Sequence, residues 1–161
     1  MNLTKKLSDA FNQQIKAEMW SSNLYLSMAV YFMNMGGLDG CVNWMKKQAE
    51  EELEHAHKLI DYSVQRGGKA IVNQIDAVPT EWENPQAVFE HVYKHELQVS
   101  EMIDQLMDLA IAENDKATQE FLRWFVTEQV EEEDSAKSIL DKFNVFGVHG
   151  LYSINHDLAK R

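Results

Sequence analysis

The sequence is poor in residues that break helices and in residues that cross-link chains. Its 161 residues include two prolines, seven glycines and one cysteine. The scarcity of proline and glycine favours long helices, and Cys41 alone cannot form an internal disulfide. No apolar run approaches the roughly 20 residues that a transmembrane helix needs. The beginning of the chain also lacks the apolar core of a signal peptide, so we expect a cytoplasmic protein.

Positive charge is also scarce. Fifteen lysines and arginines stand against 26 aspartates and glutamates, which gives a formal net charge of −11. This excess of negative charge argues against nucleic acid or an anionic membrane as a partner and favours cations. The chain is 45% hydrophobic and 10% aromatic, which is enough to build the core of a folded domain. We expect a single domain over residues 1–161.

The apolar residues recur at alternating spacings of three and four, the pattern of amphipathic α-helices. Gly36-Gly37 and residues 114–116 mark short turns, so the helices on either side of each turn should be antiparallel. The 17 residues from Lys69 to Pro85 lack this periodicity and hold both prolines, so they should cross the bundle. The fold class is therefore all-α, a four-helix bundle with one long crossover and a short fifth C-terminal helix. The predicted helices cover residues 4–34, 39–66, 86–113, 117–144 and 151–159.

Each long helix carries a glutamate or glutamine where its apolar stripe should continue. These residues are Glu18, Glu52, Glu96 and Gln129. Counted from the helix ends at about 1.5 Å per residue, they lie about 15–24 Å along their helices and share one layer of the bundle. His55 follows Glu52 by one helical turn, so its imidazole projects from the same face.

Several carboxylates in one buried layer repel each other and need positive charge between them. An oxygen-rich set of ligands with one imidazole, built from facing helices, suits paired iron or manganese. A carboxylate cluster that shares protons is the alternative, and a metal-free helical interaction module is another. Tyr25 lies two turns from Glu18 on the same face and either bonds near the group that Glu18 holds or is a core tyrosine.

The acidic run TEQVEEED interrupts the fourth predicted helix at mid-length. Such runs usually form a solvated face, and we expect this of Glu133 and Asp134. Glu128, Gln129 and Glu132 differ, because they replace the apolar stripe itself.

The short fifth helix has Leu151, Ile154 and Leu158 on one side. A four-helix bundle is already closed without this segment. We therefore expect the apolar side to contact another subunit, with packing against the end of its own bundle as the alternative.

Five phrases of the sequence resemble the bacterial non-haem ferritins. They are KAEMWSSNLYLSM, EEELEHAHKL, YKHEL, WFVTEQVEEE and GLYSINHDLAK, and they extend over essentially the whole chain. The resemblance implies a ferritin-like bundle that forms a hollow homo-oligomeric shell of 24 subunits. It also implies oxidation of Fe(II) by dioxygen or hydrogen peroxide and storage of the ferric mineral inside the shell.

The resemblance also implies roles for individual residues. Glu18, Glu52 and His55 match ligands of a first iron, and Glu52 would bridge to a second iron that Glu96 also holds. Gln129 matches a glutamine near this centre, while Tyr25 and Trp124 match aromatic residues beside it, Tyr25 being an electron donor. The positions that bind a third iron in bacterial members are Glu51, Glu128, Glu131 and Glu132.

Departures from neighbouring families narrow the choice. Di-iron oxygenases and rubrerythrins usually carry a second Glu-x-x-His on the fourth helix, where this chain has Gln129-x-x-Glu132. Leu53 stands where bacterioferritins place a haem-ligating methionine, so no haem is expected. The alternative function is a di-iron peroxidase or oxygenase that retains its metals and acts on a separate substrate.

Overall fold

The computed structural model describes residues 2–161, and within them every regular element is helical. The predicted all-α fold class is confirmed. None of the helices in this part of the chain is long and apolar enough to cross a membrane. The elements are α1 (Lys5–Met35), α2 (Asp39–Gln65), α3 (Pro85–Ala112), α4 (Lys116–Phe146), the short 3-10 helix η1 (Gly147–Gly150) and α5 (Leu151–Leu158).

Side chains fix where three of the long helices begin. The Thr4 hydroxyl accepts a hydrogen bond from the Leu7 amide at 3.3 Å, and Asn84 accepts one from Ala87 at 2.9 Å. Asp115 does the same for Thr118 at 3.0 Å. Each cap satisfies a backbone donor that has no partner within the helix. The helices therefore start where the sequence supplies a capping residue.

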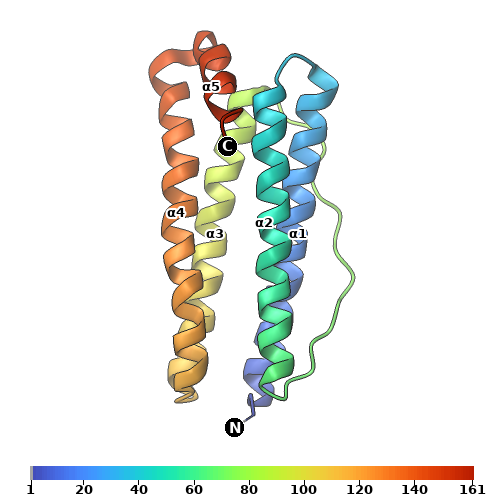
Figure 1. Ribbon diagram of the computed structural model, residues 1–161, viewed down its shortest axis with the longest axis vertical. Helices are drawn as coiled ribbons and strands as arrows, with labels where there is room; N and C mark the ends of the chain where they lie inside the picture. The colour runs from blue at the N-terminus through green and yellow to red at the C-terminus, as the bar shows by residue number, and fades with distance from the viewer. Residues whose placement is uncertain (1) are drawn as a thin grey trace.

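The four long helices form a bundle in which α1 pairs with α2 and α3 pairs with α4 (Figure 1). Short turns make each pair antiparallel. The segment between α2 and α3 runs along the outside of the bundle, so α2 and α3 point in the same direction (Figure 1). The long crossover predicted from the missing periodicity is thus present. It places helices from both pairs around one central layer.

Polar residues divide the buried interior into two apolar parts. Core A lies toward α5 and includes Phe32, Met45, Phe89 and Phe143. Core B lies at the other end of the bundle and includes residues such as Phe11, Leu59, Ile103 and Phe125. The buried residues between them, here named the polar layer, are Glu18, Glu52, His55, Glu96, Gln129 and Glu132.

The expectation that α5 faces another subunit is wrong for two of its three apolar residues. Ile154 and Leu158 are 2% and 7% exposed and belong to core A of their own chain, and Leu151 packs against the same core. The Asn155 side chain also accepts a hydrogen bond from the Cys41 amide at 3.0 Å. The bundle alone leaves the end of core A open to water, and α5 covers it.

Gly40 is required for this packing. A Cβ added at Gly40 would lie 1.8 Å from the backbone oxygen of Asn155, so α2 or α5 would have to shift. We expect Gly40→Ala to lower the free energy of unfolding by about 1–3 kcal/mol, the usual cost of overpacking. The measurement is thermal unfolding followed by circular dichroism.

Lys46→Ala is the matched control, because Lys46 is an exposed residue of the same helix. If Gly40→Ala and Lys46→Ala unfold at the same temperature, the close approach of α5 to α2 does not contribute to stability.

Candidate metal centre

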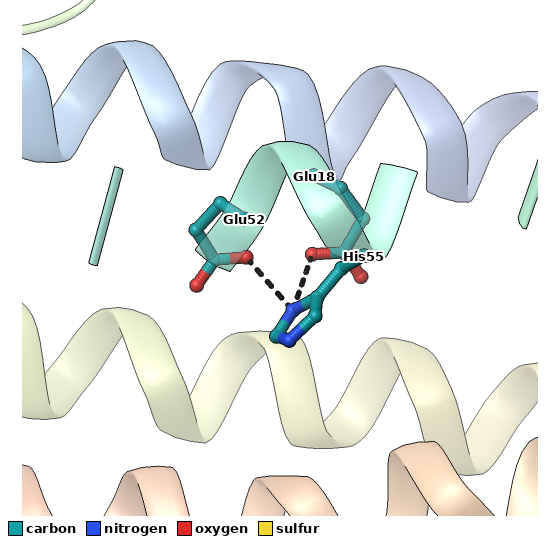
Figure 2. A group of neighbouring side chains, drawn as sticks. All are labelled: Glu18, Glu52 and His55. Carbon is teal, nitrogen blue, oxygen red and sulfur yellow. Dashed lines mark ion pairs between the residues drawn. The ribbon is translucent and has the colours of Figure 1, made fainter. Parts of the chain in front are cut away.

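Three residues of the polar layer converge on one point. Glu18 comes from α1, while Glu52 and His55 come from consecutive turns of α2, and their carboxylates face the imidazole ring (Figure 2). They are 1%, 2% and 3% exposed. One ligand atom from each lies within 4.8 Å of the others. The structure thus brings together the three residues that the resemblance matches to ligands of a first iron.

The imidazole of His55 lies between carboxylates on several sides. Its Nδ1 is 3.4 Å from a Glu52 oxygen and 3.8 Å from a Glu18 oxygen. Its Nε2 is 3.9 Å from a Glu128 oxygen. Burial would lower the pKa of His55, but its contacts with Glu18 and Glu52 raise that pKa to about 11. In the metal-free chain, a protonated imidazole therefore supplies the positive charge of this site.

One imidazolium does not balance the carboxylates around it. Burial and the neighbouring charges of Glu18 and Glu96 raise the pKa of Glu52 well above its ordinary value, despite its contact with His55. Burial acts on Glu18 in the same direction, but its contact with His55 outweighs it, so the pKa of Glu18 is lowered. The centre thus holds one carboxylate that is readily ionised and one that resists ionisation.

Two carboxylate oxygens in this site are buried without a hydrogen bond. Within residues 2–161, the Oε2 atoms of Glu18 and Glu52 have no hydrogen-bond partner, whereas the other Glu18 oxygen accepts from Gln14 at 2.9 Å. Buried polar atoms are normally paired, because leaving one unpaired costs about 1–3 kcal/mol. The same two atoms face the His55 Nδ1 at 3.8 and 3.4 Å, and a bound cation that replaces the imidazole proton fits as their partner.

Glu96 stands outside this three-residue cluster and is held from two sides. The Tyr25 hydroxyl donates to one of its carboxylate oxygens, and the Gln129 amide donates to the other at 3.2 Å. Burial and the charge of Glu132 raise the pKa of Glu96 to about 7. Tyr25 and Gln129 were both predicted to lie near the centre, and the structure places each in contact with Glu96.

The four residues matched to a third iron are more dispersed. Glu132 is buried, and the Gln48 amide donates to it at 2.8 Å. Glu51 and Glu128 are partly exposed, and Glu131 is exposed. Of these, Glu128 reaches His55 and Glu51 contacts the Arg161 guanidinium. The structure brings none of the four into the compact cluster that Glu18, Glu52 and His55 form.

Trp124 also lies beside the centre, as the sequence predicted. Its ring meets the His55 ring edge to face, with centroids 5.4 Å apart. The Lys58 ammonium lies 3.2 Å from the centroid of the Trp124 ring, a cation–π contact. Because Trp124 is 39% exposed, it forms part of the wall between His55 and solvent.

The sequence did not point to three residues that help to position the carboxylates, namely Gln14, Gln48 and Ser100. Gln14 donates to Glu18, Gln48 donates to Glu132, and Gln129 also bonds the Ser100 hydroxyl at 3.2 Å. Gln14 and Gln48 each precede a layer glutamate by four residues, so they project from the same helix face. This four-residue spacing is the feature of the sequence from which Gln14 and Gln48 could have been predicted.

Comparison with known proteins finds relatives over nearly the whole chain. The model of the ferritin-like domain family matches residues 8–146. A bacterial non-heme ferritin of Bacteroides fragilis (strain 638R) is 53% identical over 159 residues, which are 99% of each chain. A bacterial non-heme ferritin of Escherichia coli O157:H7 is 31% identical over 159 residues, 98% of this chain and 96% of that protein.

A solved structure has the same fold. The open pore ferritin from the hyperthermophilic archaeon Archaeoglobus fulgidus superposes with a TM-score of 0.96 at 44% sequence identity. The match covers 99% of this chain and 98% of the archaeal one. The two chains are therefore similar in sequence as well as in fold.

The raised pKa of Glu96 predicts how the stability of the metal-free protein depends on pH. The folded chain holds the Glu96 proton more tightly than the unfolded chain, whose glutamates titrate near 4.5. Raising the pH from about 4.5 to about 7 therefore favours unfolding, by up to about 3 kcal/mol for this group. Glu96→Gln removes the carboxyl group, so this part of the decline should disappear.

The measurement is the free energy of unfolding in urea at several pH values with a chelator present. Glu101→Gln, at an exposed position of α3, is the control and should keep the decline. Equal pH profiles for Glu96→Gln and Glu101→Gln would show that Glu96 does not hold its proton in the folded chain.

Proposed function

Because this chain belongs to the ferritin family, we propose that it is an iron-storage protein that oxidises Fe(II) at a two-metal centre within each subunit. The observation that carries this proposal is that Glu18 and Glu52 each have a buried oxygen without a hydrogen-bond partner, and that both carboxylates converge with His55. A bound cation satisfies buried carboxylate oxygens of this kind. In this proposal Glu18, Glu52 and His55 hold one Fe(II), and Glu52 and Glu96 hold the second.

The proposed reaction uses the two Fe(II) ions as substrates. Each gives one electron to the same oxidant, so dioxygen takes up two electrons and two protons and leaves as hydrogen peroxide, without a free radical. Holding both ions in one site makes this joint transfer possible. A metal ion at His55 displaces the proton that the imidazole carries in the metal-free chain.

The contacts of Glu96 support an exchangeable second position. No imidazole of the metal cluster reaches Glu96, and its oxygens already accept hydrogen bonds from Tyr25 and Gln129. An oxygen-only position of this kind holds iron more weakly than one with a histidine ligand. A storage protein needs such release, because the oxidised iron must move on to the mineral.

We also propose that copies of the chain assemble into a hollow shell. Leu26, Val30 and Met33 are 48%, 44% and 52% exposed, and their spacing puts them along one face of α1. Tyr152 on α5 is 82% exposed. Exposed apolar side chains gathered on one face are typical of contacts between subunits.

The two groups of carboxylates should have separate kinetic effects. Glu52→Ala removes the one carboxylate that would contact both irons, so we expect initial Fe(II) oxidation to slow by more than roughly 100-fold, since losing even a residue that supports a ligand costs about 10- to 100-fold. Glu131→Ala changes an exposed residue and should leave the initial rate nearly intact. Stopped-flow absorbance after anaerobic loading, with oxygen uptake alongside, measures both.

If Glu131→Ala slows the first turnover as severely as Glu52→Ala, the acidic run on α4 belongs to the oxidising centre. The division between a two-iron site and a third position would then be wrong.

Iron loading distinguishes storage from the alternative of a di-iron peroxidase or oxygenase. With repeated additions of Fe(II) in air, we expect iron to remain bound far beyond the number of ions that the ligand residues can hold. Gel filtration followed by iron analysis measures the retained metal, and electron microscopy of the same fractions should show hollow particles with dense centres. Retention that stops at about two irons per subunit would favour the peroxidase or oxygenase, by the ligand count of the site.

A further inference from the structure

Arg161, just beyond α5, lies against the acidic side of the polar layer. One terminal nitrogen of its guanidinium donates to the Gln48 side-chain oxygen and the other donates to a Glu51 carboxylate oxygen. The guanidinium carbon lies 5.3 Å from the centroid of the Trp44 ring. The positive charge of Arg161 thus contacts residues of α2 that are at least 110 positions away in the sequence.

Gln48 connects this charge to α4. Its amide oxygen faces Arg161, and its amide nitrogen donates to Glu132 at 2.8 Å. Gln48 is 1% exposed, so its amide has little freedom to turn. Arg161 therefore makes a direct contact with Glu51 and reaches Glu132 through one fixed amide. Both carboxylates belong to the group matched to a third iron.

We propose that Arg161 occupies the place of a cation at Glu51 and Glu132, and that a divalent metal ion binding to these carboxylates must displace it. This inference rests on the proposed function and on the expectation that Glu51 and Glu132 bind a third metal ion. It adds a residue of the chain itself that competes with the metal. Arg161 thereby lowers the affinity of the third position for a metal ion. The two-metal centre has no such competitor, because no arginine or lysine of residues 2–161 forms an ion pair with Glu18, Glu52 or Glu96.

The exposure of the pair makes displacement possible. The side chains of Arg161 and Glu51 are 31% and 36% exposed, so water and ions reach them. An ion pair at such a position is weak and screened by salt. Once the guanidinium moves aside, the Glu51 carboxylate is free to bind a metal ion.

The test is isothermal titration calorimetry of the purified, metal-free protein with Zn(II), which binds carboxylate and imidazole ligands and is not oxidised. The third position is identified as the class of Zn(II) sites that Glu51→Gln abolishes. We expect Arg161→Gln to tighten this class by roughly fivefold, as removal of a partly exposed competing charge allows. Arg161→Lys keeps the charge but loses the fork of two donors, so it should fall in between.

Lys160→Gln is the matched control. Lys160 is the neighbouring basic residue, but its ammonium lies 3.5 Å from Asp157, so the change in net charge is the same without the contact to Glu51. Lys160→Gln should bind Zn(II) as the unaltered protein does. Circular dichroism of each variant verifies that the helices are intact.

Three results would overturn the inference. Arg161→Gln and Lys160→Gln could give equal affinities, Arg161→Gln could weaken the third position, or Glu51→Gln could abolish no class of sites. In each case the tight Zn(II) sites that depend on Glu52 would still be seen if the proposed function is correct. Absence of those tight sites would instead contradict the proposed function itself.

Discussion

The polar layer is the costliest feature of this fold, because it places carboxylates and one imidazole in the middle of a bundle that is otherwise apolar. Glu18, Glu52 and Glu96 are each at most 2% exposed. Burial, together with the charges of neighbouring carboxylates, raises the pKa of Glu52 and of Glu96. Within residues 2–161, one oxygen of Glu18 and one of Glu52 have no hydrogen-bond partner. A chain selected for stability alone would place leucine or isoleucine at these positions.

The rest of the structure makes this layer possible. Core A and core B lie on either side of it, so each supplies hydrophobic stabilisation at one end of the helices. The crossover makes α2 and α3 parallel (Figure 1), which brings Glu52 and Glu96 to the same depth from the same ends of their helices. Gln14 then fixes one oxygen of Glu18 and leaves the other without a hydrogen bond, whereas Gln129 and Tyr25 hold the two oxygens of Glu96.

Much of this could be predicted from the sequence, because the long helices have strong periodicity and the layer interrupts it in each of them. Glu18, Glu52 and Glu96 were recognisable as polar residues at apolar positions, and His55 was recognisable from its place one helical turn after Glu52. The packing of α5 was not predictable in this way. Its apolar side was clear, but whether Ile154 meets its own bundle or another subunit depends on the fit between Asn155 and Gly40, which no local pattern encodes.

The role of Arg161 was hidden for a related reason. A basic residue beyond a short helix is ordinary in sequence, and its contact with Glu51 follows from where the path of α5 brings it. Glutamines such as Gln48 are similarly ordinary on a helix. Their significance comes from the carboxylate that each one contacts across the bundle.

The central claim is that the polar layer holds two metal ions at defined ligands. The most direct measurement is X-ray diffraction from crystals soaked anaerobically in Fe(II), with data collected at the iron absorption edge. We expect two anomalous peaks in each subunit, one between Glu18, Glu52 and His55 and one between Glu52 and Glu96. Peaks confined to exposed acidic side chains, with none in the polar layer, would contradict it.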